Sequence, residues 1–403
     1  MLIVKKFGGS SVADAKRVRH VAGIVARDVR AGHKVVVVLS AQGKTTDRLI
    51  GKAKELAAEP SKRELDMLLA IGEQESVALM AICLNAMGIS AVSLNAFQVP
   101  MNTTRVHGNA RLKSVETLRM KEELEQGRVV LVTGFQGVDS RGDFTTLGRG
   151  GSDTTAVALA AALSADRCQI YTDVEGVYTA DPRVVPDARK LREIGYDEML
   201  ELASTGAKVL HNRCVELGRK YKVEIEVLSS MTDAPGTLVR EDSKVEKMLI
   251  SGVAADRNVL LCTIFGMKNE PGQAFRLFQK LGAAGINVDI ILQSVPHDGD
   301  KCMAFTVRKE DEAETRRVID EYAKETGGIS AFYRDDLAKV SVVGAGLTSN
   351  PGTASLVFEA LFDVQINIVM ITTSEIKISV LVDAAEADSA VRSIHERFKL
   401  YEG

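Results

Sequence analysis

The chain of 403 residues has no tryptophan, only eight prolines and only five cysteines. The cysteines are far apart and form no Cys-x-x-Cys pair, which argues against a disulfide scaffold. The six histidines form no His-Glu-x-x-His motif, so the sequence does not support a zinc site. No apolar run is as long as a membrane span, and no signal-peptide pattern opens the chain. We therefore expect a cytoplasmic protein with reduced, mostly buried thiols and no membrane segment.

An excess of one charge is also absent, with 51 basic and 54 acidic side chains and a formal net charge of −3. This balance gives no electrostatic reason to expect a nucleic acid partner. Charged residues make up 26% of the chain and apolar residues 45%, which is ordinary for a soluble globular protein. Because the chain is too long for a single hydrophobic core, we expect two or three domains.

Up to about residue 240, apolar runs alternate with helical patterns. Uninterrupted apolar strands indicate burial on both faces, so this region predicts an α/β fold with a mainly parallel sheet sandwiched by helices. Strands are expected at 2–6, 34–40, 91–95, 129–133, 169–172 and 224–228. Helices are expected at 14–30, 47–58, 64–87, 114–125, 154–164 and 197–221. Ligands of such sheets bind beyond the carboxyl ends of the strands, so the loops there matter most.

Residues 35–47, VVVVLSAQGKTTD, resemble the end of a P-loop, since a buried strand leads into a Gly-Lys-Thr sequence at Gly43. The full motif, G-x-x-x-x-G-K-[ST], needs a glycine five positions before Gly43, where this chain has Val38. The loop is too short to surround a phosphate chain with backbone N–H groups. We interpret it as a βα turn whose helix is capped by a threonine or Asp47, and we expect phosphate binding elsewhere.

Two glycine-rich turns carry groups that bind anions. Residues 5–12, KKFGGSSV, place Lys6 beside two glycines and two serines that can cap the next helix. Residues 145–163, TTLGRGGSDTTAVALAAAL, bring three glycines and Arg149 to the start of a long helix. Such a helix start favours a phosphate or carboxylate, and a guanidinium can bind a carboxylate with two parallel hydrogen bonds. The alternative for both segments is a structural turn before a capped helix.

Three further segments give weaker indications. Residues 171–185, YTDVEGVYTADPRVV, place aromatic and polar groups at a strand end, suited to a base and ribose or simply to a structured loop. Glu73, in LLAIGEQES, interrupts an apolar helix face and is either solvated or the partner of a ligand cation. Lys208, in GAKVLH, is either a surface lysine or a second cation for phosphoryl transfer.

An internal repeat follows a polar connector at 232–248. IFGMKNEPGQAFRLFQKLGAAGIN begins at Ile264, and GAGLTSNPGTASLVFEALFDVQIN begins at Gly344, with Pro-Gly and Ile-Asn pairs matching at one spacing. Each copy has the pattern strand, Pro-Gly turn, amphipathic helix, strand, and further strands are expected at 301–307 and 375–382. This order predicts two ferredoxin-like βαββαβ units.

Taken together and in this order, these segments resemble the aspartate kinases of the amino acid kinase family. The similarity lies in KFGGSSV, SAQGKTTD, GFQGVDSRGDFTTLGRGGSDTTA, YTDVEGVYTADPR and GAKVLH, and the repeat resembles tandem ACT domains. The resemblance implies an amino acid kinase domain over 1–240, a first ACT domain over 250–335 and a second over 336–395. Some relatives insert one ACT unit within the other, so 396–403 is a candidate for the last strand of the first unit.

The resemblance also implies an activity. The expected reaction is ATP-dependent phosphorylation of the β-carboxylate of L-aspartate to 4-phospho-L-aspartate, with ATP and Mg²⁺ as cofactors. This reaction opens lysine, threonine and methionine biosynthesis. Because the β-carboxylate, with a pKa of about 4, is ionised at neutral pH, no strong general base is required. The chemical demand is instead for positive charge around the transferred phosphoryl group.

Residue roles are carried over from the resemblance as expectations. Lys6, Lys208 and Asp153 are expected to be catalytic. Glu73 is expected to pair with the α-amine of aspartate and Arg149 with its α-carboxylate. The remaining substrate-side positions are Ser40, Thr46, Phe135, Gly150, Gly151 and Ser152. The nucleotide and its phosphates are expected to contact Lys6, Phe7, Gly8, Gly9, Ser10, Thr172, Asp173, Tyr178, Asp181, Arg183, Lys208 and Val209.

ACT pairs in such enzymes bind an end-product amino acid, so the resemblance implies inhibition by lysine, threonine or both. The candidate effector contacts are Asn269, Gly272, Ala274, Asn287, Asp289, Gln293, Asn367 and Ile368. A homodimer or higher homo-oligomer through the ACT domains is expected. Some relatives also make a short ACT-only chain from an internal start, for which Met248 is a candidate.

Three alternatives are weaker. An amino acid kinase acting on glutamate, acetylglutamate or carbamate would not explain the tandem repeat or the combination of Glu73 with Arg149. An inactive amino acid sensor would not need the intact set of Lys6, Arg149, Asp153 and Lys208. A nucleotide-binding dehydrogenase would need a G-x-G-x-x-G sequence directly after a strand, and none lies in that place.

Overall fold

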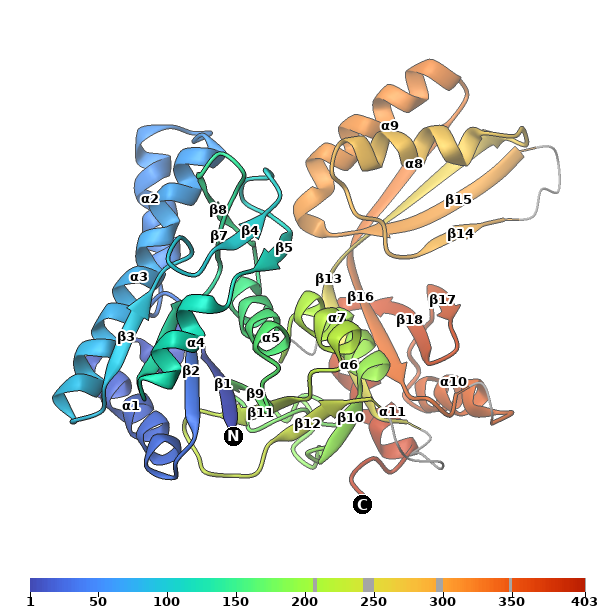
Figure 1. Cartoon of the computed structure of the whole chain (residues 1–403). Helices are drawn as coiled ribbons and strands as arrows, with labels where there is room; N and C mark the ends of the chain where they lie inside the picture. Colours follow the sequence, from blue (N-terminus) through green and yellow to red (C-terminus); the bar gives the residue numbers. More distant parts are fainter. Residues whose placement is uncertain (206–208, 242–249, 295–299, 348–349, 403) are drawn as a thin grey trace. The chain divides into compact units, whose positions relative to one another are not determined.

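The computed structural model describes residues 1–205, 209–241, 250–294, 300–347 and 350–402. The chain forms two compact units, each with its own sheet and hydrophobic core (Figure 1). Unit 1 comprises Met1–Tyr178 and Lys190–Val245, and unit 2 comprises Thr179–Arg189 and Glu246–Gly403. The chain thus passes from one unit to the other within the polar connector, and one short internal segment belongs to unit 2.

Unit 1 is built around an eight-stranded sheet. Its strands are β1 (Leu2–Phe7), β2 (Lys34–Leu39), β3 (Ala91–Leu94), β6 (Val129–Thr133), β9 (Arg167–Thr172), β10 (Glu193–Gly195), β11 (Ile225–Ser229) and β12 (Thr237–Arg240). Their order is β10-β12-β11-β9-β1-β2-β6-β3. All neighbours from β3 to β11 run parallel, while β12 is antiparallel to β11. The predicted mainly parallel sheet is confirmed, with all six predicted strands in it.

Helices cover both faces of this sheet. They are α1 (Ala15–Arg30), α2 (Thr45–Leu56), α3 (Lys62–Ala86), α4 (Leu118–Glu125), α5 (Gly151–Leu163), α6 (Tyr196–Ser204) and α7 (Asn212–Tyr221), with a 3-10 turn η1 (Gly9–Val12). Val25 of α1 and Met80 of α3 pack with Val37 of β2 in one core. The apolar helix α5 packs on β1, β2 and β9 and is buried along most of its length. Continuous apolar strands are therefore explained by burial between two helical layers.

Unit 1 also contains a second, four-stranded sheet, which was not predicted from the sequence. Its strands are β4 (Met101–Thr103), β5 (Leu112–Val115), β7 (Gln136–Val138) and β8 (Phe144–Thr146), in the order β5-β4-β7-β8. Because β5 occupies the start of the helix expected at 114–125, α4 begins only at Leu118. These strands have three or four residues each, too few to show a periodic pattern.

Two helix predictions were also wrong in detail. The helix expected at 197–221 is two helices, because α6 ends at Ser204 and the Thr205 hydroxyl donates to the carbonyl of Glu201 at 2.8 Å. The helix expected at 47–58 begins at Thr45 without any side-chain cap, and Lys44 holds the N-cap position. The turn before it is fixed instead by the N–H of Gly43, which donates to the Gly9 carbonyl at 3.0 Å.

Unit 2 contains one six-stranded antiparallel sheet. Its strands are β13 (Gly252–Lys268), β14 (Ile291–Gln293), β15 (Asp300–Val307), β16 (Ser330–Val343), β17 (Met370–Thr373) and β18 (Lys377–Asp383), in the order β14-β15-β13-β16-β18-β17. Its helices are α8 (Gln273–Ala283), α9 (Glu312–Thr326), α10 (Thr353–Asp363) and α11 (Ala387–Arg397), with 3-10 turns η2 (Lys309–Asp311) and η3 (Ala384–Glu386).

The two long strands β13 and β16 run through both halves of unit 2 (Figure 1). The carboxyl-terminal part of β13 pairs with β15, and its first residues pair with the end of β16, which pairs with β18. Each half therefore has four strands in ferredoxin-like order, with helices α8 and α9 on one half and α10 and α11 on the other. The predicted pair of βαββαβ units is confirmed.

The expectation that 396–403 returns to the first half as a strand was wrong. The fourth strand of the first half is the beginning of β16, and the fourth strand of the second half is the beginning of β13. Residues 398–401 are a turn after α11, and Leu400 is buried in the core of the second half. The place of the fourth strand in each half is taken by part of a long strand, because β13 and β16, with 17 and 14 residues, are long enough to pair in both halves.

The repeat seen in the sequence has a backbone reason. Gly272 and Gly352 precede α8 and α10 with φ of +91° and +95°, a conformation that favours glycine. The segment 179–189, although earlier in the chain, belongs to the second half of unit 2. There the Thr179 carbonyl accepts from the N–H of Val253 at 2.8 Å, and the Thr179 hydroxyl bonds to His395 Nε2 at 2.9 Å.

Among the described residues, α3 is the one helix whose length and composition would allow it to cross a membrane, and half of that stretch is buried inside unit 1. A core helix of a globular domain passes the same test, so this is weak evidence for a membrane segment.

Candidate active site

A cleft of about 980 Å³ opens at the carboxyl ends of β1, β2 and β6 in unit 1. Its walls come from the loops after these strands, from α2 and α3, and from the start of α5. Twelve of the predicted site residues line it: Lys6, Gly8, Gly9, Ser40, Thr46, Glu73, Phe135, Arg149, Gly150, Gly151, Ser152 and Asp153. Residues separated by more than a hundred positions in the chain are thus brought to one cavity, where a parallel sheet is expected to bind its ligand.

Lys6 and Asp153 form the charged centre of the cleft. Lys6 Nζ lies 2.6 Å from Asp153 Oδ1, and both side chains are only slightly exposed. Lys6 lies near the carboxyl end of β1, and a Cβ added at Gly8 would be 3.6 Å from its Nζ. Next to it, Gly9 must be glycine because a Cβ there would collide with the carbonyl oxygen of Ala41. The loops after β1 and β2 are thus packed against each other without the geometry of a P-loop.

The amino end of α5 supplies the opposite wall. Gly150 is its N-cap, with a φ of +68°, and an added Cβ would collide with the ring of His211. None of the described side chains caps α5, and the positive end of the helix dipole lies at the cleft because Gly150–Asp153 line it. The Ser152 hydroxyl accepts a hydrogen bond from the Ser40 hydroxyl at 2.9 Å, which joins this helix start to the end of β2.

Glu73 is a buried carboxylate with one unsatisfied oxygen. Its side chain is 3% exposed, and Oε1 accepts from the N–H of Ala41 at 3.0 Å. Among the residues that the structure describes, Oε2 has no hydrogen-bond partner. Burial raises the pKa of Glu73 to about 7, and hydrogen bonding from the Ala41 N–H, from its own backbone N–H and from the Gln136 side chain offsets this only in part. Such a group favours a cationic partner, since a nearby positive charge would stabilise its ionised form.

Backbone strain marks the same cavity. Phe135 lies two residues after the end of β6 and has a φ of +68°, which is rare for a residue that is not glycine. Its ring packs so close to Gly151 that a Cβ there would lie 2.9 Å from the ring. Its carbonyl accepts from the N–H of Leu147 at 2.8 Å. The strained turn therefore fixes the start of α5 against the end of β6.

The other described residues of the predicted nucleotide site do not line this cleft. The Phe7 side chain is fully buried and stacks on Tyr171 at 4.4 Å between ring centroids, so it belongs to the core rather than to a ligand site. Ser10 is exposed, and its carbonyl accepts from Arg17. Thr172 and Asp173 lie at the end of β9, where the Thr172 hydroxyl donates to Asp173 Oδ1 at 2.9 Å.

The other members of that group are distributed over both units. Tyr178 and Val209 are half-buried in unit 1, and burial raises the pKa of Tyr178. Asp181 and Arg183 are in unit 2, where the Arg183 guanidinium lies 2.7 Å from the Asp181 carboxylate and lowers its pKa. Lys208 lies outside the described residues.

The eight candidate effector residues are not gathered at one place within the chain. Asn269, Gly272, Ala274, Asn287, Asp289 and Gln293 lie in the first half of unit 2, around α8 and β14. Asn367 and Ile368 lie in the second half, just before β17, at the opposite edge of the sheet. Asp289 is paired with the buried Lys339, and Ile368 packs on the core of its half.

Several cleft residues were not predicted from the sequence, among them Asp66, His107 and Asn109. Asp66 is fully buried on α3, seven residues before Glu73 and so on the same helix face. That spacing was the available indication, because an acidic residue on the buried face of an apolar helix is unusual.

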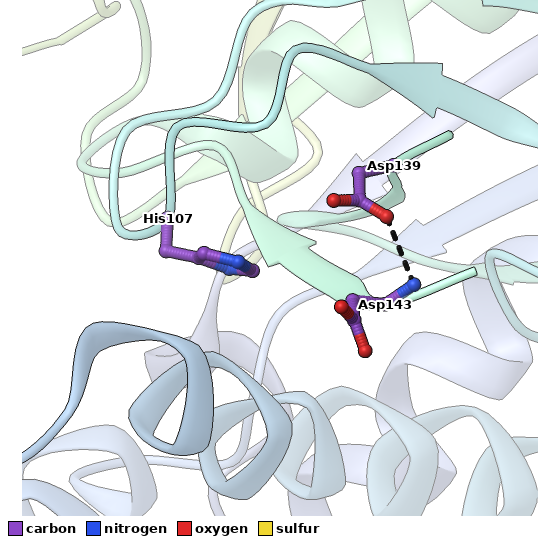
Figure 2. A group of neighbouring side chains, drawn as sticks. All are labelled: His107, Asp139 and Asp143. Carbon is purple, nitrogen blue, oxygen red and sulfur yellow. Dashed lines mark hydrogen bonds between the residues drawn. The ribbon is translucent and has the colours of Figure 1, made fainter. Parts of the chain in front are cut away.

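His107 also lies close to Asp139 and Asp143, and Figure 2 shows the three side chains converging. Their possible ligand atoms are within 4.8 Å of one another. Asp143 is nevertheless bound to Arg63 at 2.6 Å, and Asp139 accepts from the N–H of Asp143 at 3.0 Å. Since these carboxylates are already neutralised by a guanidinium or engaged by backbone groups, we do not assign a metal site here.

Comparison with known proteins agrees with this architecture. Residues 1–229 match the model of the amino acid kinase family, and residues 263–327 and 340–398 each match an ACT domain model. An aspartokinase of Geobacillus stearothermophilus is 49% identical over 402 residues, covering 100% of this chain and 98% of that protein. An aspartokinase of Mycolicibacterium smegmatis is 47% identical, covering 99% of this chain and 96% of that protein.

Solved structures give the same answer. E. coli aspartokinase III in complex with aspartate and ADP aligns with a TM-score of 0.84 and 29% identity, over 98% of this chain and 99% of that chain. The same enzyme in complex with lysine and aspartate aligns with a TM-score of 0.75 and 28% identity, over the same shares of both chains.

The fold and the cleft define a small-molecule kinase of the amino acid kinase fold, followed by a pair of ACT domains. Within that class, the chain belongs to the aspartokinase family. The dehydrogenase and the inactive sensor are therefore set aside, and allosteric regulation in general is part of what the family shares with this chain.

Proposed function

We propose that this chain transfers the terminal phosphoryl group of ATP to the β-carboxylate of L-aspartate, giving 4-phospho-L-aspartate and ADP. The observation that carries the proposal is the cleft itself. It combines the Lys6–Asp153 pair, the uncapped start of α5, the unsatisfied Oε2 of Glu73 and the exposed Arg149. An α-amino acid with a second carboxylate has three charged groups, and the cleft offers a complement to each.

In the proposed arrangement, Glu73 binds the α-amine and Arg149 binds the α-carboxylate. The β-carboxylate then lies toward Lys6 and the amino end of α5, and one of its oxygens attacks the γ-phosphorus in line. A P–O bond forms to aspartate as the bond from the γ-phosphorus to the bridging oxygen breaks, and ADP leaves with that oxygen.

The role of Lys6 is electrostatic: its ammonium opposes the negative charge of the approaching carboxylate and of the phosphoryl oxygens. Asp153, at 2.6 Å, holds Lys6 in place. Mg²⁺ is proposed to arrive with ATP, bound mainly by phosphate oxygens, as is usual for kinases. Lys208 and the backbone after β9 are proposed to complete the nucleotide site, with Thr172, Asp173, Tyr178, Asp181, Arg183 and Val209.

Regulation by lysine, threonine or both is proposed to act through the ACT domains. E. coli aspartokinase III has been crystallised with lysine, which supports an amino acid effector for this chain. Because the candidate effector residues lie at opposite edges of the unit 2 sheet, we propose that two copies of the chain complete the effector sites in a homo-oligomer. A short ACT-only chain beginning at Met248, which lies outside the described residues, is a further proposal.

The proposed domain division remains 1–240 for the kinase domain, 250–335 for the first ACT domain and 336–395 for the second. The boundary at 335 falls within β16, which both halves share. We also propose the cytoplasm as the place of function, as the reduced cysteines suggest.

The test is formation of an acyl phosphate from L-aspartate, ATP and Mg²⁺, trapped as the hydroxamate. We expect hydroxamate with aspartate but not with glutamate or acetylglutamate, and less of it when lysine, threonine or both are added. Turnover of glutamate or acetylglutamate but not aspartate would contradict the roles of Glu73 and Arg149. Activity with aspartate that neither effector changes would retain the kinase and remove the effector proposal.

A further inference from the structure

The helix α3 presents two buried carboxylates to the cleft, and they are satisfied in different ways. Within the described part of the chain, Oε2 of Glu73 has no hydrogen-bond partner. Asp66, two helical turns earlier, accepts hydrogen bonds on both oxygens and is 1% exposed. A carboxylate so fully engaged has no capacity left for a ligand cation. Asp66 therefore acts on the cleft through the groups it holds.

Asp66 joins three separate elements. It accepts from the N–H of Gly108 at 2.9 Å and from His107 Nδ1 at 3.1 Å, both in the loop between β4 and β5. It also accepts from the Thr146 hydroxyl at 2.6 Å and from the Thr146 N–H at 3.1 Å, at the end of β8. Four donors on one buried carboxylate thus join α3 to the β4–β5 loop and to the end of β8, which together form one wall of the cleft.

The wall that Asp66 holds carries Arg149. Thr146 is three residues before Arg149, and the turn between them passes through Gly148, with a φ of +77°. A Cβ on Gly148 would lie 3.2 Å from the carbonyl oxygen of Gly108, so the turn lies directly on the loop that Asp66 binds. The Thr146 carbonyl accepts from the N–H of Ala110 at 2.9 Å, which fastens the loop and the strand to each other.

The two proposed aspartate-binding groups are thus on different elements, Glu73 on α3 and Arg149 after β8. We propose that Asp66 is a positioning residue that sets the distance between Glu73 and Arg149 and so the fit for an α-amino acid. This inference rests on the proposed function. Loss of its charge would let the Arg149 turn move relative to Glu73, which weakens aspartate binding more than the phosphoryl transfer itself.

The substitution Asp66→Asn tests this, because it keeps the shape but presents an amide N–H₂ group to donors that need an acceptor. We expect the KM for aspartate to rise tenfold or more, with the KM for ATP within twofold and a smaller change in kcat. The matched control is Asp139→Asn. Asp139 is also buried and accepts from the N–H groups of Arg141 and Asp143, but it does not line the cleft. This control is expected to lower thermal stability while leaving the aspartate KM near wild type.

If Asp66→Asn does not fold, Thr146→Val replaces it, since this change removes only the hydroxyl donor to Asp66. An aspartate KM raised at least threefold is then expected. An aspartate KM equal to wild type in the folded variant, or an equal rise in Asp139→Asn, would overturn the inference. If the wild-type protein forms no aspartyl phosphate at all, the proposed function has failed instead, and the two failures are distinguishable.

Discussion

The raised pKa of Glu73 makes a prediction about pH that depends on one carboxylate. Its pKa is about 7 in the folded protein against an ordinary value of 4.5, so the folded state binds its proton more tightly. The difference corresponds to roughly 3 kcal/mol. The tighter proton binding by Glu73 contributes to the free energy of unfolding in full below pH 4.5, and this contribution is lost as the pH rises through about 7. In the ligand-free protein, the ionised Glu73 carboxylate therefore destabilises the folded state above pH 7.

Bound aspartate should lower the pKa of Glu73 again, because its ammonium group favours the ionised carboxylate. We expect the KM for aspartate to fall about tenfold per pH unit as the pH rises toward 7, and to level off above it. In Glu73→Gln this pH dependence should disappear, and the KM should rise by a factor corresponding to roughly 2–5 kcal/mol. The ligand-free Glu73→Gln protein should be more stable than wild type at pH 8 and not at pH 4.5.

The assays are aspartate kinetics from pH 5.5 to 8.5 and thermal unfolding of the ligand-free protein at several pH values. Glu123→Gln is the control, since Glu123 is equally buried but is paired with Arg119 and Arg128 at 2.6 Å each. Its loss should destabilise the protein, because it leaves two guanidinium groups without their partner. A wild-type aspartate KM that is flat from pH 5.5 to 8.5, or a Glu73→Gln KM within twofold of wild type, would refute the reasoning.

The other predictions concern the walls of the cleft. Lys6→Ala should lower kcat by about 10²–10³-fold, because the positive charge that stabilises the transferred phosphoryl group is lost. The KM for aspartate should change little, and steady-state kinetics measures both constants. Arg149→Ala should raise the KM for aspartate by roughly tenfold to a hundredfold, the size of a lost charged hydrogen bond, while kcat changes less. A defect in ATP binding alone for both variants would contradict these roles. Gly150→Ala should lower the melting temperature and the activity together, because its Cβ would collide with His211 at a positive φ.

Local patterns in the sequence predicted the parallel sheet, the repeat and the glycine-rich turns of the cleft, whereas Ser40, Thr46 and Phe135 were predicted only from the resemblance to the aspartate kinases. Lys6 lies at the end of a buried strand and Gly8 and Gly9 follow it, while Arg149 lies two residues before an apolar helix. Buried strands and helix starts can be predicted from a few neighbouring residues.

Asp66 was missed for the opposite reason. Its partners Gly108 and Thr146 are 42 and 80 residues away in the chain, and no local pattern links them to α3. The strand shared between the halves of unit 2 was missed likewise. The beginning of β13 belongs to a half whose other strands come after residue 336, and only the pairing with β16 reveals this. Long-range pairing decides both features, and a single sequence does not display it.

The sharing of β13 and β16 has a consequence for regulation. Because one continuous sheet connects both halves, the candidate effector residues near β14 and β17 are joined by a rigid element rather than by a linker. At these two edges the backbone has a neighbouring strand on one side, and the edges expose apolar side chains such as Ile291, which is 50% exposed, and Ile371, which is 42% exposed. A second copy that covers these edges would bury apolar surface and bring the two groups of effector residues near each other. In the proposed homo-oligomer, an amino acid bound there would contact both halves of unit 2 at once, because β13 and β16 run through both halves.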